Sequence, residues 1–467
     1  MSNRPNLIYV FADQLRFSSV GFNGDAYAKT PELDEIAQQC VNMENTVSGH
    51  PVCAPYRASL LTGKYTTKTG MVINEIRINQ NHRTFANVLT ENGYETCYIG
   101  KWHLYAAQLG HHFDVKNSYI PKGERLGFDD FFAGYNFHHK YYAPYAYYHL
   151  DSPEKIYCQG YEPDYQTDMA IEHINRLAKS DKPFAMFLSI GTPHDPWTKD
   201  NVPQEYYDLF SDTDFPLPPN YSNKNDKYAD MWAKFNPGAR GKLNEQKRVY
   251  YAMVANLSKN IGKLYDAIGK AGIADNTIFV FTSDHGEMQG SHGRHAKNIF
   301  YDEAVRVPFL IKWGDNLKNG KNSTAMNTVD IMPTLLSMMS LPIPDTVEGI
   351  DISKSIIDGI QIDNPCLMMG TGPTAIYGNG YEWRALRTDR YTYAKYLRDD
   401  SEYLFDNIND PYQMNNLISN PDYAVIRSQM TGILIKKMND AGDRFRKNSY
   451  YKKHWVKNRK ILPELPE

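Results

Sequence analysis

Four short apolar runs of the chain are each followed at once by a cluster of polar, ionisable side chains. The runs cover residues 7–11, 94–99, 184–190 and 277–281. Near-continuous apolar runs of this length are typical of strands that are buried on both faces, as in a parallel sheet. Because open α/β sheets bind ligands outside the carboxyl ends of their strands, the four clusters predict one shared site at that edge.

Segments with helical periodicity separate these runs. They cover residues 30–40, 84–91, 164–179 and 244–270, with apolar residues spaced three and four apart. Strands that alternate with helices indicate an α/β fold with a large, mostly parallel sheet flanked by helices.

The chain beyond residue 360 has a different pattern. Residues 383–387 and 390–396 flank a Thr-Asp pair and predict an antiparallel hairpin, and residues 423–438 predict a helix. We therefore expect an α/β domain over residues 1–360 and a smaller C-terminal α+β subdomain over residues 361–467.

Charge and hydropathy limit the partners of the chain. A formal net charge of −3 over 467 residues gives no global field that would draw the chain to nucleic acid or membrane, and we expect neither partner. No apolar run reaches the ~18 residues of a membrane span, and no signal-peptide pattern precedes the first predicted strand. We expect a cytoplasmic protein, or a periplasmic or secreted one if a leader was trimmed. Residues 444–460 hold eight Lys or Arg and no acid, which predicts a solvated basic tail.

The chain has five cysteines, an odd number at wide spacing, which predicts neither a disulfide framework nor a structural zinc site. Only Cys53 lies in a recognisable pattern. Residues 51–63 read P-V-C-A-P-Y-R-A-S-L-L-T-G, which is C-x-P-x-R followed by Thr-Gly. By itself this pattern fits a buried thiol at a helix start equally well, so its interpretation depends on the four polar clusters.

Together with these clusters, the C-x-P-x-R segment resembles the signature of type I sulfatases of the alkaline-phosphatase superfamily. In that family a maturation enzyme oxidises the cysteine to formylglycine, whose hydrated aldehyde is the nucleophile. The motifs G-K-W-H at 100–103, T-P-H-D at 192–195 and S-D-H-G-E at 283–287 stand in the family's order. The resemblance covers about residues 6–438 and implies a sulfuric ester hydrolase that acts on a sulfate monoester.

The resemblance also implies a metal site for one divalent cation, with Ca²⁺ as the expected ion and Mg²⁺ as the alternative. The positions that match the family's ligands are Asp13, Gln14, Cys53, Asp284 and His285. The family most often has Asp in place of Gln14 and Asn in place of His285. Because a hard cation prefers oxygen, His285 is the ligand least expected from chemistry alone.

Further roles follow from the resemblance for five cations and histidines. Arg57 would hold the formylglycine hydrate, while Lys101 and Lys297 would bind the sulfate oxygens. His103 would take a proton from the hydrate and so release sulfate and restore the aldehyde. His194, with Lys297, would protonate the leaving oxygen.

The expected partners are a sulfated small molecule or saccharide and the maturation enzyme, and a homo-oligomer is left open. The aromatic loop at residues 135–149 and Trp197 favour a sugar over a small aryl group. One alternative is a phosphonate monoester or phosphodiester hydrolase of the same superfamily, against which the Lys101/His103 pair argues. Another is a non-catalytic carbohydrate-binding relative, which would have lost a residue such as Cys53.

Overall fold

A computed structural model describes residues 4–106, 108–235 and 240–466. Its largest element is an eight-stranded sheet in the order β11-β2-β10-β9-β1-β8-β4-β5. All neighbouring strands are parallel except the two pairs that involve β10, which confirms the predicted, mostly parallel α/β architecture. The strands are β1 (Asn6–Ala12), β2 (Val41–Met43), β4 (Glu95–Lys101), β5 (Phe131–Tyr135), β8 (Phe184–Ile190), β9 (Thr277–Ser283), β10 (Phe309–Trp313) and β11 (Gly320–Asn322).

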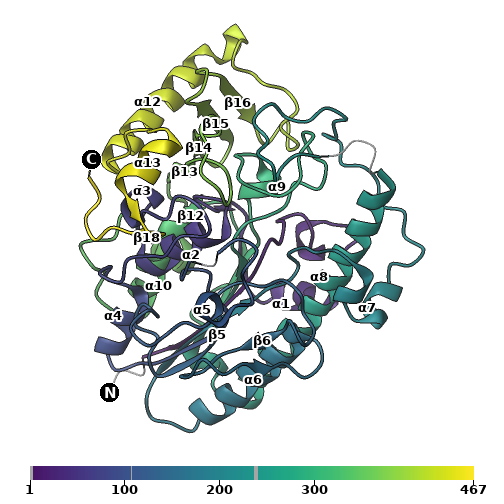
Figure 1. The fold of residues 1–467 in the computed structure, drawn as a ribbon, viewed down its shortest axis with the longest axis vertical. Helices are drawn as coiled ribbons and strands as arrows, with labels where there is room; N and C mark the ends of the chain where they lie inside the picture. Colours follow the sequence, from purple (N-terminus) through teal and green to yellow (C-terminus); the bar gives the residue numbers. More distant parts are fainter. Residues whose placement is uncertain (1–3, 107, 236–239, 467) are drawn as a thin grey trace.

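Helices cover both faces of this sheet (Figure 1). One face packs on α1 (Pro31–Ala37), α6 (Glu162–Leu177) and α8 (Arg240–Lys270), and the other on α2 (Cys53–Thr62), α4 (Phe85–Glu91) and α10 (Thr328–Met338). Successive residues of the central strand β1 enter opposite cores, as strand geometry requires: Tyr9 packs on the α2 side and Val10 on the α8 side. All seven residues of β1 are buried, so this strand anchors the site that follows it.

A second, antiparallel sheet lies at the C-terminal end of the chain. It contains β13 (Cys366–Gly370), β14 (Trp383–Arg387), β15 (Tyr391–Tyr396) and β16 (Glu402–Asp406), in that order. The helix α12 (Ala424–Asp440) packs against it, and both lie at one end of the molecule (Figure 1). The predicted hairpin is formed by β14 and β15, and the predicted last helix is α12.

The basic tail is more ordered than a solvated chain end. It forms α13 (Asn448–His454) and a short hairpin of β17 (Val456–Lys457) and β18 (Lys460–Ile461). Tyr451, Trp455 and Ile461 are buried in the same core as α2, while the lysines of the tail stay exposed. The tail therefore wraps over the protein with its lysines solvated, as expected, and its buried aromatic residues supply the apolar area that packs it against the core.

Short elements complete the fold. They are α3 (Thr66–Thr69), α5 (Val115–Ser118), α7 (Gln204–Asp208), α9 (Asp302–Val305), α11 (Ser353–Asp358), β3 (Thr46–Val47), β6 (Tyr147–Tyr148), β7 (Ile156–Tyr157) and β12 (Met326–Asn327). Across the described residues, we find no helix with both the length and the apolar composition needed to cross a bilayer.

Candidate active site

The carboxyl ends of β1 and β9 place two predicted motifs side by side. Ala12 of β1 is paired with Ser283 of β9, so Asp13 and Asp284 follow as neighbours. The Gln14 N–H donates to Asp284 Oδ1 at 3.0 Å. Gln14 has a left-handed backbone, with φ 71°, which a residue other than glycine keeps only where its surroundings fix it. The turn after β1 is thus held in place by Asp284, which follows β9.

Cys53 is the first residue of α2 and is fully buried. The Ala54 N–H donates to Asn74 Oδ1 at 3.0 Å, which caps the start of the helix. The Cys53 Sγ lies 3.2 Å from His285 Nε2 and 3.7 Å from Asp13 Oδ1.

Four buried side chains form a group that could hold a metal ion. One ligand atom each of Asp13, Cys53, Asp284 and His285 lies within 4.8 Å of the others. His285 Nδ1 is 3.0 Å from the Gly286 carbonyl, which can only accept, so Nδ1 carries the proton and Nε2 presents its lone pair to the group. Burial and the neighbouring Asp13 raise the pKa of Asp284. Two buried carboxylates that repel one another in this way fit a hard divalent cation.

Gln14, the fifth predicted ligand, has its side chain engaged beside this group. Its Oε1 accepts a hydrogen bond from Lys297 Nζ, and its Nε2 donates to Glu287 Oε2 at 2.7 Å. A carboxylate on one side and an ammonium on the other fix the orientation of the amide. The role of Gln14 as a metal ligand stays a prediction.

Arg57, one helical turn beyond Cys53, joins the acids to the neighbouring strands. Its Nη2 donates to Asp13 Oδ2 at 3.2 Å and to Asp284 Oδ2 at 3.4 Å. Its Nη1 donates to the Lys101 carbonyl at 2.7 Å and to Ser189 Oγ at 2.6 Å. Since these groups are buried, the guanidinium balances charge that water cannot reach.

The glycine at the end of β4 brings the next motif close to these acids. Gly100 has φ 101°, and a Cβ there would lie 2.1 Å from the Ser189 carbonyl oxygen of β8, so no other residue fits without a shift. Lys101 follows directly, and its Nζ forms a buried ion pair with Asp13 Oδ2. The close approach of β4 to β8 therefore delivers Lys101 to the group.

His103 lies two residues further on, with a left-handed backbone of φ 56°. Burial and the charge of Lys101 lower the pKa of His103 to about 3, against the opposing effect of Cys53. Both ring nitrogens of His103 are buried, and Cys53 is near enough to act on the ring through its charge and a side-chain hydrogen bond. A neutral, buried ring beside Cys53 can accept a proton there.

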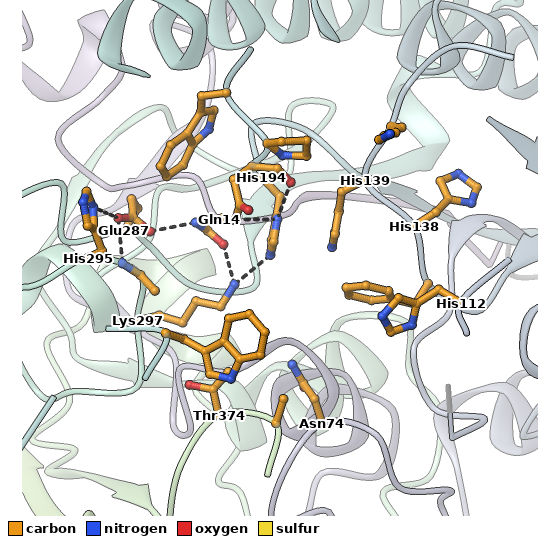
Figure 2. A pocket seen from close by; sticks show the side chains of 18 of the residues that line it. Gln14, Asn74, His112, His138, His139, His194, Glu287, His295, Lys297 and Thr374 are labelled. Carbon is orange, nitrogen blue, oxygen red and sulfur yellow. Dashed lines mark hydrogen bonds and ion pairs between the residues drawn. The ribbon is translucent and has the colours of Figure 1, made fainter. Parts of the chain in front are cut away.

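His194 and Lys297 lie next to one another at the cavity (Figure 2). The Lys297 Nζ lies 2.8 Å from His194 Nε2, and His194 Nδ1 lies 3.1 Å from Asp195 Oδ1. Burial and Lys297 lower the pKa of His194, but Asp195 and Asp13 outweigh them and raise it to about 9. His194 is therefore protonated at neutral pH, which suits a group that gives a proton to a leaving oxygen.

The predicted site residues thus converge, and several further ones accompany them. Ser189 holds Arg57, Glu287 holds Gln14, and Asp195 holds His194. His139 contacts Lys101, with Nε2 3.2 Å from Nζ. Glu287 and Asp195 stand inside the motifs S-D-H-G-E and T-P-H-D, so their position was visible in the sequence although their roles were not.

A cavity of about 610 Å³ opens above His194 and Lys297. The Trp197, Trp232, Phe137 and His112 rings are part of its lining, and Figure 2 shows the labelled polar side chains around it. Broad aromatic surfaces with a few fixed polar groups are typical of pockets that bind organic rings.

Comparisons with known proteins agree with this geometry. The family model described as Sulfatase matches residues 5–341, and the model described as N-sulphoglucosamine sulphohydrolase, C-terminal, matches residues 290–440. An ulvan-active sulfatase from Formosa agariphila is 37% identical over 98% of this chain and 87% of its own length. An arylsulfatase from Clostridium perfringens is 30% identical over 93% of this chain and 94% of its own length.

The fold is also that of a solved relative. The crystal structure of the yidJ protein of Bacteroides fragilis matches with a TM-score of 0.82 and 30% identity, over 97% of this chain and 98% of that one. The family model covers well over half of the chain, and both curated relatives match it over nearly its whole length. The chain therefore belongs to the sulfatase family and is a sulfuric ester hydrolase.

Proposed function

We propose that this sulfatase removes a sulfate monoester from a carbohydrate, with formylglycine made from Cys53 as nucleophile and one divalent cation, Ca²⁺ or else Mg²⁺. The observation that carries the proposal is the position of the Cys53 Sγ. It belongs to the buried group with Asp13 and Asp284, and His194, which lines the cavity, has its Nε2 4.0 Å from Asp13 Oδ1.

The buried group would hold the cation through Asp13, Asp284, His285 and the oxidised Cys53, with Gln14 alongside. A bound cation would neutralise the sulfate oxygens and leave the sulfur open to attack. Lys101 and Lys297 would bind the same oxygens as point charges.

Two histidines would move protons at opposite sides of the ester. His103 would accept a proton from the hydroxyl of residue 53, because its ring is neutral and lies beside that residue. His194, which is protonated at neutral pH, would give a proton to the departing oxygen. A sugar alcohol is a poor leaving group and needs that proton.

The support for a carbohydrate comes from the cavity and from the relatives. Trp197 and Trp232 line the cavity, and the exposed ring of Trp232 can stack on a sugar. One relative is described as ulvan-active and another as an arylsulfatase, so a sugar and an aryl sulfate are the two leaving groups to compare.

The test begins with protein made together with a formylglycine-generating enzyme. Mass spectrometry of the peptide that contains Cys53 should show a loss of about 18 Da, as sulfur and two hydrogens give way to oxygen. The mature protein should release sulfate from sulfated mono- and disaccharides, and Cys53→Ala should not. Full activity with unmodified Cys53, or a preference for phosphodiesters or phosphonate monoesters over sulfates, would overturn the proposal.

A further inference from the structure

The ring of His139 lies between Lys101 and His194, in the loop that follows β5, and none of the roles described above uses it. Its Nε2 is 3.2 Å from Lys101 Nζ. Its ring is stacked on that of His194, with 3.6 Å between centroids and 3° between planes. Figure 2 shows the two rings side by side at the wall of the cavity. One side chain therefore touches both cationic sides of the site.

The hydrogen bonds of the loop define which His139 nitrogen carries the proton. The Tyr141 hydroxyl donates its single proton to the Gly191 carbonyl at 2.5 Å. Its oxygen can then only accept from His139 Nδ1, which is 3.4 Å away. Nδ1 is thus the protonated nitrogen, and Nε2 offers its lone pair to the Lys101 ammonium. Burial, His194 and Lys101 all lower the pKa of His139, which keeps the ring neutral.

The backbone and both faces of His139 are also fixed. Asn201 Nδ2 donates to the His139 carbonyl at 3.0 Å, and Asn201 Oδ1 accepts from the Tyr141 N–H at 2.9 Å. The Phe137 ring meets His139 edge-on, with 4.4 Å between centroids and 87° between planes. The imidazole is therefore a rigid surface on which other side chains can be placed.

We propose that His139 is a positioning residue that aims the Lys101 ammonium at the sulfate and holds the His194 ring in line with the leaving oxygen. This inference rests on the proposed function, because it concerns the same two side chains. Lys101 has three N–H donors on a flexible stem. Asp13 takes one and His139 a second, so the direction of the third is set. The stacked face of His139 limits rotation of the His194 ring.

The two contacts can be separated by two substitutions. His139→Phe keeps a flat ring against His194 and loses the acceptor for Lys101. His139→Gln keeps an acceptor near the position of Nε2 and loses the stacked ring. His173→Phe is the matched control, since the His173 ring packs against that of Phe131 at the opposite end of β5, with 3.7 Å between centroids and 36° between planes, away from the site.

The experiment measures kcat and KM of each mature variant on a nitrophenyl sulfate and on a sugar sulfate. His139→Phe should lower kcat/KM for both substrates by a similar factor, about 10- to 100-fold, because Lys101 acts on the sulfate that they share. His139→Gln should cost the sugar sulfate at least several times more than the nitrophenyl ester, because only the poor leaving group needs the His194 proton. His173→Phe should match the wild type.

The result that overturns the inference is a kcat/KM within twofold of wild type for both His139 variants. A rise in KM confined to the sugar sulfate, with the same size in both variants, would also overturn it, because His139 would then contact the sugar. Tyr141→Phe serves as a milder variant that removes the acceptor for Nδ1, and it should show the pattern of His139→Phe with a smaller loss. If the wild type hydrolyses no sulfate ester, the proposed function has failed, which is a separate outcome.

Discussion

The two sides of the active site differ in burial and in the way their charges are balanced. Around Cys53, the side chains of Asp13, Asp284 and Arg57 are at most 1% exposed and are paired with one another. On the other side, His194 and Lys297 line a cavity, with His194 Nε2 2.8 Å from Lys297 Nζ. The buried side can therefore act only on the group common to every substrate, while the open side can meet the variable leaving group.

Loss of the cation should have the largest effect, because it disables the buried side for every substrate. Exhaustive chelation should abolish turnover and lower Tm, and added Ca²⁺ or Mg²⁺ should restore both. In Asp13→Asn the same treatment should leave Tm unchanged, because the group can no longer hold the ion. Calorimetry with and without chelator measures this change in Tm independently of activity. A wild-type rate that chelation leaves unchanged would contradict a metal-dependent reaction.

Arg57→Gln should show how much the buried side of the site depends on its charge pairing for the stability of the protein. Asp13 and Asp284 would lose their buried counter-charge, so the free energy of unfolding of the chelated protein should fall by about 3–5 kcal/mol. Arg176→Gln, which breaks the exposed pair with Glu95, should cost at most about 1 kcal/mol. Urea unfolding of both variants gives the difference, and equal losses would contradict the buried pairing.

His103→Ala should slow the release of sulfate by about 10²–10⁴-fold for aryl and sugar sulfates alike, since His103 acts on the nucleophile side. Stopped-flow measurement should show a burst of alcohol followed by a stall. A loss of rate that depends on the leaving group would contradict the assignment of His103 to the nucleophile side.

The sequence predicted the strands and the convergence of their motifs for a local reason. Each apolar run is long enough to be a buried strand, and parallel strands must end at one edge, so Asp13, Lys101, His194 and Asp284 had to meet. The same reasoning could not reach His139. Its contact with Lys101 depends on a loop that Asn201, 62 positions away in the chain, holds in place through the His139 carbonyl.

The basic tail shows a second limit of prediction from sequence. Its charges dominate the composition of residues 444–460, yet Tyr451 and Trp455 decide where it lies. Spacing of single aromatic residues in a short segment does not reveal which core they will join. The Arg459 guanidinium donates to the Glu75 carbonyl at 2.8 Å, a contact between segments that no local pattern connects.

The protonation state of His194, on the open side, predicts a moderate effect of pH on kcat. Because the pKa of His194 is raised to about 9, its acid form is present at neutral pH and is lost as pH rises through that value. The kcat of a sugar sulfate should therefore hold up to about pH 9 and then fall, whereas that of a nitrophenyl sulfate should change less. In His194→Gln the difference between the two pH profiles should disappear. Identical profiles in the wild type would contradict the role of His194 as the acid.

The division between the two sides is tested most directly by a series of sulfate esters whose leaving alcohols differ in pKa. The slope of log kcat/KM against that pKa is measured for the wild type, His194→Ala and His103→Ala. We expect a steeper slope for His194→Ala, because poor leaving groups lose their proton donor. The line for His103→Ala should coincide with that of the wild type, because kcat/KM reports the steps up to alcohol release and His103 assists the later release of sulfate. A His194→Ala line parallel to that of the wild type, or a steeper line for His103→Ala alone, would contradict the division between the two sides.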